Sequence, residues 1–294
     1  MSSIKISNLT RDYGKNKGIF DVSMEIKAGE VFGFLGPNGA GKTTTIRHLL
    51  GFLKPKSGSS QVDGLDCWND RHTILKEVGY IPGEISLFDE MSGNQYLNFI
   101  MKYRGNNCVQ RKNELIKYLD LDGSVKIKKM SKGMKQKVGI IAALMHDPQI
   151  LILDEPTSGL DPLMQNKFID LIIKEKEKGK TILMSSHMFE EVERTCHKVA
   201  IIKNGRIVAT DSIEDLKAKR LRKYIVTFKD KISVDNFSKE DFKMRIISND
   251  RIEVIIKDDI NELISVLTKY QILNISAPSQ SLEELFLHYY GGEN

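Results

Sequence analysis

The residues best suited to chemistry lie in one glycine-rich stretch, which reads Gly36-Pro37-Asn38-Gly39-Ala40-Gly41-Lys42-Thr43. It fits the pattern G-x-x-x-x-G-K-[ST], the phosphate-binding loop known as Walker A. Glycines let the backbone turn successive N–H groups toward one oxyanion. In such a loop the lysine reaches the β- and γ-phosphates, and the following hydroxyl binds Mg²⁺. The stretch therefore predicts a nucleoside triphosphate site with Lys42 and Thr43 in those two roles.

The flanking sequence supports this prediction. Residues 31–35 form a short apolar run that is typical of a buried strand, and residues 44–52 have helical periodicity. A helix that begins near Thr44 directs its positive dipole end toward the loop. This strand–loop–helix frame excludes a chance glycine-rich turn.

A second cluster of chemical groups follows another apolar run. Residues 149–153 predict a buried strand, and Asp154 and Glu155 come directly after it, as in a Walker B pattern. Carboxyl ends of parallel strands meet at the ligand-binding edge of a sheet. We expect Asp154 to hold Mg²⁺ through water and Glu155 to orient or deprotonate the attacking water.

Two single residues have an open interpretation. Tyr13 lies upstream of the loop and is either a stacking platform for a base or a half-buried strand tyrosine. His187 follows a predicted strand at 181–185, and it is either catalytic or a helix cap or core histidine. Position alone does not decide either case.

The composition fits a soluble globular protein of one or two domains. The chain has 294 residues, with 28% charged and 40% hydrophobic residues and a net charge of +5. This mild charge does not argue for nucleic acid. No apolar run reaches the length of a membrane span, and residues 1–11 have no signal-peptide core. The three scattered cysteines, Cys67, Cys108 and Cys196, are expected to be reduced cytosolic thiols.

Residues 86–145 show helical periodicity throughout and predict an inserted helical subdomain at about 86–148. This part is basic: eleven lysines and arginines against three acids lie between Lys102 and Lys137. Such a run is usually a solvated face, and the alternative is a face near phosphates or an anionic membrane leaflet.

The rest of the chain predicts mixed elements. Before the helical part we expect strands at 4–9 and 19–26, a turn at 11–14, a loop at 54–59, and a helix at 69–78 capped by Asn69. After residue 155 we expect a helix opened by Asp161 and Pro162, a hairpin at 198–210, and a short helix at 212–220. From residue 224 we expect a small α+β domain with strands at 224–228, 243–247, 251–256 and 272–275 and helices at 259–270 and 281–290. The predicted domains are therefore 1–215 and 216–294.

Further motifs resemble one family. The segment Ser131-Lys132-Gly133-Met134-Lys135-Gln136 resembles the signature motif of ATP-binding-cassette (ABC) ATPases. The segment Ser158-Gly159-Leu160-Asp161 resembles their D-loop, His187 their switch histidine, and Tyr13 their adenine-stacking aromatic. The resemblance covers residues 2 to about 215. It implies an α/β fold with a P-loop NTPase (RecA-like) core, a β-subdomain and the inserted helical subdomain.

The resemblance also implies a head-to-tail dimer, with ATP and Mg²⁺ held between Walker A of one subunit and the signature of the other. Ser131 and the N–H of Gly133 would then contact the γ-phosphate in trans, with Lys132, Met134 and Asp161 beside them. Lys132 replaces the first glycine of the family signature, as in a variant seen in bacterial exporters, and its charge is expected to add to the clamp.

A second departure concerns the Q-loop. The family usually has glutamine after Tyr-x-Pro, whereas this chain has Gly83 followed by Glu84. Either Glu84 takes over part of the contact with Mg²⁺, or the loop couples to the membrane partner through its backbone alone. We hypothesise the first.

The closing segment 281–287 looks like that of single-cassette ATPases of bacterial drug, antibiotic and peptide exporters. We therefore expect a cytoplasmic ATPase subunit, peripheral on the inner face of the cell membrane, that binds a separate permease. It would form a homodimer or pair with a second cassette. The alternative is a soluble ABC ATPase that acts on ribosomes or DNA. The single Walker A motif, and the roughly ninety residues between it and the signature, disfavour that class. A binding module without catalysis would lack the catalytic groups that are present here. The sequence does not identify the transported substrate.

Overall fold

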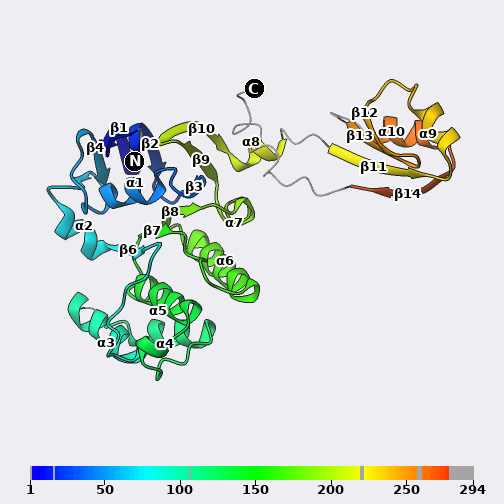
Figure 1. Ribbon diagram of the computed structural model, residues 1–294. Helices are drawn as coiled ribbons and strands as arrows, with labels where there is room; N and C mark the ends of the chain where they lie inside the picture. Colours follow the sequence, from blue (N-terminus) through cyan, green and yellow to red (C-terminus); the bar gives the residue numbers. More distant parts are fainter. Residues whose placement is uncertain (1, 16, 106, 219–221, 257–259, 278–294) are drawn as a thin grey trace. The chain divides into compact units, whose positions relative to one another are not determined.

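The computed structural model describes residues 2–15, 17–105, 107–218, 222–256 and 260–277 (Figure 1). The chain divides into two compact units, Met1–Ile213 and Glu214–Asn294. The boundary predicted from sequence was residue 215. Each unit is described by itself below.

The first unit is built on a six-stranded sheet with the strand order β10-β9-β3-β8-β7-β6. Strands β6, β7, β8, β3 and β9 are parallel, and β10 runs antiparallel to β9. The bounds are β3 Val31–Leu35, β6 Val78–Ile81, β7 Ile150–Asp154, β8 Thr181–Ser186, β9 Lys198–Lys203 and β10 Arg206–Ser212. Every residue of β3, β7 and β8 is buried, because apolar runs suit strands covered on both faces.

A second, antiparallel sheet has the order β2-β1-β4-β5. Its strands are β1 Ser2–Asp12, β2 Gly18–Lys27, β4 Ser57–Val62 and β5 Leu65–Asp66. Helix α1, Lys42–Leu49, contributes Ile46 and Leu49 to a core shared with both sheets. Figure 1 shows α1 beneath β1 and beside β3. The phosphate-loop segment is therefore anchored at both of its ends.

Two local predictions in this sheet are wrong. Arg11 and Asp12 belong to β1, where they pair with Ile19 and Gly18 of β2, so the predicted turn at 11–14 begins later. Residues 57–59, predicted as loop, belong to β4 because Ser57 and Ser59 pair with β1. Pairing with a neighbouring strand overrides the weak strand preference of this serine- and glycine-rich stretch.

Helices α3, α4 and α5 form the lower group in Figure 1. Helix α3 begins with a capping box of Ser92 and Gln95 and ends at Gly105 in the left-handed conformation. Helix α2 begins at Arg71 after Asp70, so the predicted Asn69 cap is wrong; the Asn69 N–H donates to Asp66 instead. Helix α7 had not been predicted. The bounds are α2 Arg71–Glu77, α3 Gly93–Arg104, α4 Val109–Tyr118, η1 Ile127–Lys129, α5 Lys132–Leu144, α6 Pro162–Glu177 and α7 Phe189–Thr195.

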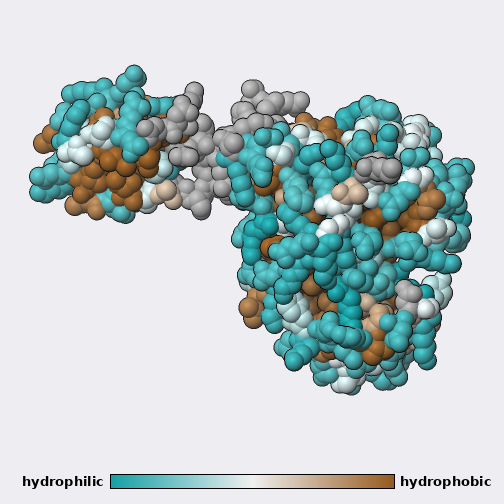
Figure 2. All heavy atoms as spheres, turned by 180° about the vertical axis from the view of Figure 1, so that it is seen from behind, coloured by the Kyte–Doolittle hydropathy of each residue, from teal (hydrophilic) through white to brown (hydrophobic). Residues whose placement is uncertain are grey.

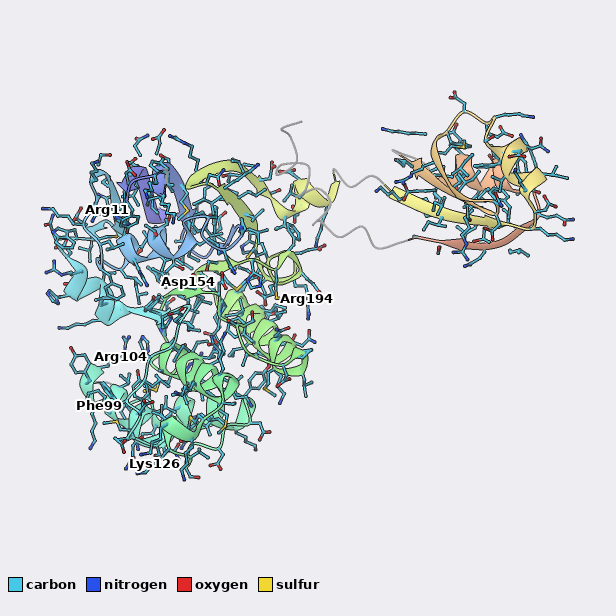
Figure 3. The ribbon with its side chains drawn as sticks, in the orientation of Figure 1. Arg11, Phe99, Arg104, Lys126, Asp154 and Arg194 are labelled. Carbon is cyan, nitrogen blue, oxygen red and sulfur yellow. The ribbon has the colours of Figure 1, made fainter. Side chains whose placement is uncertain are left out.

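Much of the basic stretch between residues 102 and 137 is paired with acids or carbonyls within the chain. Arg111 forms an ion pair with Glu175, and Lys126 and Lys128 form ion pairs with Glu90. Lys126 lies at the outer end of the helical part in Figure 3, and its side chain is 54% exposed. The stretch is therefore partly structural, and it is not a uniform solvated face.

The second unit contains β11, α9, β12, β13, α10 and β14 in chain order, and α8 spans the boundary between the units. Its antiparallel sheet has the order β12-β13-β11-β14, which is the ferredoxin-like βαββαβ arrangement. Helix α9 had not been predicted, and the expected helix at 281–290 lies outside the described residues. The bounds are α8 Ile213–Ala218, β11 Arg222–Phe228, α9 Lys231–Phe237, β12 Lys243–Ser248, β13 Arg251–Ile256, α10 Ile260–Leu267 and β14 Ile272–Ser276.

The core of the second unit contains Phe228, Phe237 and Leu263, contributed by β11, α9 and α10. The unit also has exposed apolar side chains on its surface (Figure 2). None of the helices in the described part of the chain combines the length and apolar character of a membrane span.

Candidate active site

The phosphate-loop segment connects β3 to α1, and two of its glycines cannot be replaced without a clash. A Cβ atom at Gly36 would lie 2.5 Å from the carbonyl oxygen of Ile202. At Gly41, where φ is +114°, it would lie 2.7 Å from Cγ2 of Ile19. Glycine is therefore required both for the left-handed backbone and for the close packing against neighbouring strands.

Gly41 is the N-cap of α1, and no side chain caps this helix end. The first N–H groups of a helix have no partner within the helix, and the helix dipole adds positive charge at that end. The loop and the start of α1 thus offer the backbone donors that an anionic phosphate group needs.

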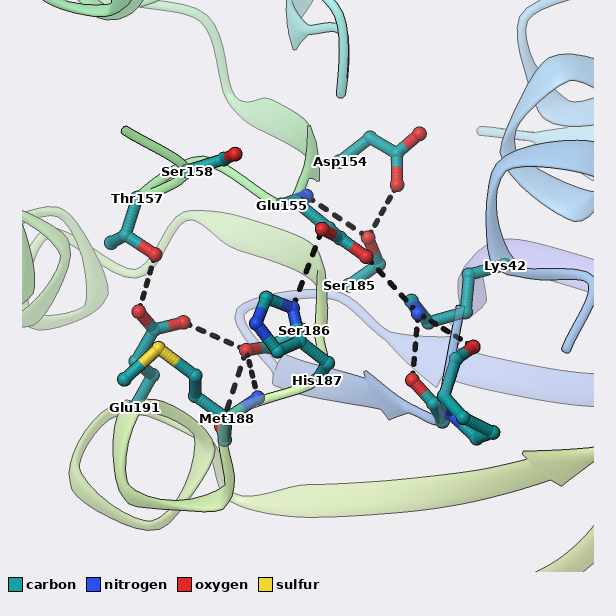
Figure 4. Close-up of polar contacts among 12 residues, drawn as sticks. Lys42, Asp154, Glu155, Thr157, Ser158, Ser185, Ser186, His187, Met188 and Glu191 are labelled. Atoms are coloured by element: carbon teal, nitrogen blue, oxygen red, sulfur yellow. Dashed lines mark hydrogen bonds and ion pairs between the residues drawn. The ribbon is translucent and has the colours of Figure 1, made fainter. Parts of the chain in front are cut away.

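Lys42 lies at the centre of the site and is 4% exposed. Its ammonium donates to the carbonyl oxygens of Gly36, at 2.7 Å, and Pro37, at 3.1 Å. It also forms an ion pair with Oε1 of Glu155, at 3.1 Å (Figure 4). The buried charge is therefore compensated by an acid from the end of a different strand.

Asp154, the last residue of β7, is fully buried. Its Oδ1 accepts a hydrogen bond from the hydroxyl of Ser185, whereas the buried Oδ2 has no hydrogen-bond partner. A Cβ atom at Gly83 would lie 3.2 Å from this Oδ2. A buried carboxylate oxygen without a donor is costly, and it suits a hard cation such as Mg²⁺.

Glu155 connects the carboxyl ends of β7 and β8. Its backbone is left-handed, with φ of 45°, and its N–H donates to the carbonyl oxygen of Ser185 at 3.2 Å. Its carboxylate lies between Lys42 and His187, whose Nδ1 is 3.3 Å from Oε2 (Figure 4). A non-glycine residue held at positive φ is typical of functional sites.

His187 is 50% exposed, and the N-cap of α7 is Met188. It is therefore neither a core histidine nor a helix cap. Tyr13 lies just after the end of β1, and 52% of its surface is exposed, so it is an exposed residue outside the strand. The Arg11 guanidinium lies over the Tyr13 ring, 5.5 Å from the centroid.

A cavity of about 760 Å³ brings most of the predicted residues together, a size suited to a small-molecule ligand. Lys17, Arg47 and Tyr80 also contribute to its wall, although the sequence did not single them out. The predicted residues that line it are Tyr13, Asn38, Gly39, Gly41, Lys42, Thr43, Thr44, Glu84, Lys132 and Glu155.

Ser131, Gly133, Met134 and Asp161 are not among the residues that line this cavity. Ser131 caps α5 by accepting from the N–H of Met134 at 3.2 Å, and Asp161 caps α6 in the same way. The Lys132 ammonium donates to the hydroxyl of Ser158 at 2.9 Å. The signature segment thus packs against the D-loop segment of its own chain.

Further polar residues, which no sequence motif indicated, support this site. Ser185 contacts Asp154 and Glu155, and Ser186 and Thr157 both donate to Glu191 of α7. Burial raises the pKa of the Glu191 carboxyl, against the opposing effect of those two hydroxyl donors. The Ser-Ser-His sequence at the end of a buried strand could have indicated the two serines, whereas the role of Glu191 is visible only in the tertiary structure.

Comparison with known proteins decides the family. A family model described as ABC transporter matches residues 19–158. The chain is 38% identical to an ABC transporter ATP-binding protein of Methanocaldococcus jannaschii, over 72% of this chain and 79% of the relative. The chain belongs to the ABC transporter family. It is an ATP-binding and ATP-hydrolysing cassette of this family.

Two other relatives have names that state a function. The chain is 38% identical to the bacitracin transport ATP-binding protein of Bacillus licheniformis, over 76% of this chain and 73% of the relative. It is 36% identical to the linearmycin resistance ATP-binding protein of Bacillus subtilis, over 72% and 70%. These relatives do not favour the ribosome- or DNA-directed alternative.

Solved structures show the same fold. An ATP-binding subunit of an ABC transporter superposes with a TM-score of 0.68 at 31% identity, over 74% of this chain and 92% of that chain. A dimeric bacterial ABC transporter cassette has a TM-score of 0.65 at 23% identity, over 71% and 98%. The P-loop NTPase fold predicted from the sequence is confirmed.

Proposed function

We propose that this ABC ATPase powers efflux of a drug, antibiotic or peptide through a separate permease on the inner face of the cell membrane. ATP hydrolysis is supported mainly by the position of Glu155, whose carboxylate lies between Lys42 of the phosphate-loop segment and His187. Similarity to the bacitracin and linearmycin proteins supports the export part.

ATP binding rests on the loop and the start of α1. In this proposal the N–H groups of residues 38–39 and 41–44 hold the phosphates, and Lys42 contacts the β- and γ-phosphates. The ring of Tyr13 stacks on the adenine, with the Arg11 guanidinium near the opposite face.

The partnerless Oδ2 of Asp154 and the hydroxyl of Thr43 are the groups proposed to hold Mg²⁺. Bound there, Mg²⁺ would neutralise charge on the β- and γ-phosphates. Glu84 lines the same cavity, which supports the proposal that it replaces part of the missing Q-loop glutamine.

Glu155 is proposed as the general base. Its carboxylate contacts Lys42, and a γ-phosphate is a stronger partner for that ammonium. Once the phosphate takes this contact, one oxygen of Glu155 is free to orient and deprotonate water. His187, 3.3 Å from the other oxygen, is placed to contact the γ-phosphate as its sensor.

Residues of the signature are proposed to act across a dimer, formed with a second copy or with another cassette. Ser131 and the N–H of Gly133 would contact the γ-phosphate held by the partner subunit. The Lys132 ammonium has a neutral hydroxyl as its partner, so its charge is available to the same phosphate. The absence of Ser131 and Gly133 from the residues that line the cavity of their own chain supports this assignment for these two residues.

The Glu84 proposal predicts a specific defect. Glu84→Ala should raise the Mg²⁺ concentration that gives half-maximal ATPase activity by about ten-fold, because one charged oxygen near the metal is lost. The control is Glu25→Ala, which removes an exposed carboxylate from β2. An unchanged Mg²⁺ requirement would contradict this role of Glu84. The alternative, that the loop couples to the membrane partner through its backbone alone, would then remain.

Co-purification tests the export function. The tagged full-length chain is isolated from gently solubilised membranes of its source cell, and bound proteins are identified by mass spectrometry. A stoichiometric multi-helix membrane protein is the expected result. Recovery of ribosomal proteins or DNA in its place would overturn the export function and leave the ATP chemistry standing.

A further inference from the structure

Glu191 of α7 is a buried acid that lies outside the nucleotide cavity. It is 3% exposed, and it is absent from the residues that line the cavity. Its two carboxylate oxygens have different partners: Oε1 accepts from the hydroxyl of Thr157, and Oε2 accepts from the hydroxyl of Ser186 at 2.8 Å (Figure 4).

These two partners belong to two different loops. Thr157 lies two residues after Glu155, in the turn that follows β7. Ser186 directly precedes His187 at the end of β8, and its hydroxyl accepts from the N–H of Met188 on the other side of His187 at 2.9 Å. One carboxylate thus links the turn after Glu155 to the segment that carries His187.

Backbone pairing between the two strands ends before the reacting groups. The last paired residues of β7 and β8 are Asp154 and Ser185. Beyond them, the Glu155 N–H still donates to Ser185. Residues 156–157 lie in a turn closed by the Ser158 N–H and the Glu155 carbonyl oxygen, and residues 186–188 begin with Ser186, which pairs with Leu35 of β3. Glu191 is the group that both segments contact.

We propose that Glu191 is a positioning residue for ATP hydrolysis, whose carboxylate holds the loops of Glu155 and His187 at the separation their joint action requires. This inference rests on the catalytic roles proposed for Glu155 and His187. Glu191 acts through Thr157 and Ser186 and does not itself contact nucleotide.

The chemical nature of the group supports this role. Burial of a carboxylate disfavours its charged form, and an apolar side chain could fill such a site at lower cost. An apolar side chain could not accept two hydroxyl hydrogen bonds from separate loops. The carboxylate of Glu191 therefore serves to hold the two loops in place.

The first test compares Glu191→Gln and Glu191→Ala with Glu190→Gln in the full-length chain. Glu190 is the adjacent acid on α7 and is exposed, so its substitution makes a matched charge change away from both loops. Steady-state ATPase kinetics and the stoichiometry of ATP binding are measured. Glu191 variants should lose about ten-fold or more in kcat with unchanged KM and full binding stoichiometry, because misplaced groups slow the chemical step. Glu190→Gln should match the parent.

The second test is a double-variant cycle with His187→Ala. If Glu191 acts through the His187 loop, Glu191→Gln should add little to the loss already caused by His187→Ala. Full kcat in Glu191→Gln, a raised KM with kcat unchanged, or a fully additive double variant would each overturn the proposal. If His187→Ala and Glu155→Gln themselves retain turnover, the proposed catalytic roles fail instead, which is a separate outcome.

If the Glu191 variants fail to fold, substitutions of Thr157 test the proposal instead. Thr157→Ser keeps the hydroxyl that donates to Glu191, and Thr157→Val replaces it with a methyl group of similar size. Normal kcat in the serine variant and a roughly ten-fold loss in the valine variant would support the proposal. Equal activity of the two variants would overturn it.

Discussion

Glu155 connects several residues of the site and is also the proposed general base. Its backbone is left-handed, its N–H is fixed by Ser185, and its carboxylate contacts both Lys42 and His187. The contact with Lys42 balances a buried ammonium that would otherwise be costly. The proposed reaction depends on the γ-phosphate replacing Glu155 as the partner of the Lys42 ammonium.

Lys42→Ala tests this residue-scale account. The variant should lose about a hundred- to a thousand-fold in kcat, because the principal positive group at the transferred phosphate is removed. The measurement is phosphate release at saturating Mg-ATP. Lys56→Ala, which removes an exposed lysine from the loop before β4, serves as the control. Retained turnover in Lys42→Ala would overturn the site assignment.

At the residue scale, the sequence predicted groups that belong to local motifs. The phosphate-loop segment and the acids Asp154 and Glu155 each follow a buried apolar strand, and the structure brings them together. Glu191 was missed because its partners, Thr157 and Ser186, are spread over two loops. The roles of Tyr13, Ser131 and Asp161 remain predictions.

At the scale of elements, a buried ionic cluster connects the helical part to α6. Glu175 of α6 is 1% exposed and pairs with Arg111 of α4 at 2.7 Å. It also pairs with Lys178 and with the nearly buried Lys180, which in turn contacts Asp147 after α5. Removal of Glu175 leaves Arg111 and Lys180 with the more exposed Asp147 as their acidic partner, so Glu175 is the buried acid that links α4 and the residues after α5 to α6.

Glu175→Gln should lower the free energy of unfolding at pH 7 by roughly 3 kcal/mol, because Lys180 and Arg111 lose their buried partner. Burial would raise the pKa of Glu175, but hydrogen bonds from Lys180, Lys178 and Arg111 outweigh it and lower the pKa below its ordinary 4.5. A lowered pKa means that the stabilisation is complete above 4.5 and is lost as the pH falls through the folded-state value.

Urea unfolding of both proteins at pH 7, 5.5 and 4 checks this prediction. The difference between wild type and variant should be constant from pH 7 to 5.5 and should narrow at pH 4. The matched control is Glu177→Gln, at the last residue of α6. A difference that grows as the pH falls would contradict the assigned direction of the pKa shift.

Elements with a strong hydrophobic pattern were predicted from the sequence. Elements that form through pairing with a strand distant in the sequence were not fully predicted. Strands β3, β7 and β8 are apolar runs buried on both faces. Strand β4 was partly missed because serine and glycine carry little strand preference, and it forms by pairing with β1. Helices α7 and α9 span only Phe189–Thr195 and Lys231–Phe237, too short to show a clear helical period.

At the scale of the whole molecule, the matched family region, residues 19–158, lies in the first unit. The nucleotide cavity belongs to this unit, whereas the signature residues Ser131 and Gly133 do not line it. We therefore propose that two cassettes complete each other's sites. The ferredoxin-like second unit has a hydrophobic core of its own.

The most direct test of this claim is the molar mass of Glu155→Gln in saturating Mg-ATP, measured by light scattering during size-exclusion chromatography. The substitution keeps the shape of the side chain and removes its capacity to act as a base. The account predicts a stable dimer that retains two unhydrolysed ATP molecules and returns to monomer when nucleotide is removed. A variant that stays monomeric with ATP bound would contradict pairing with a second copy and leave only a different cassette as the partner, and a variant that hydrolyses ATP at the wild-type rate would contradict the role of Glu155.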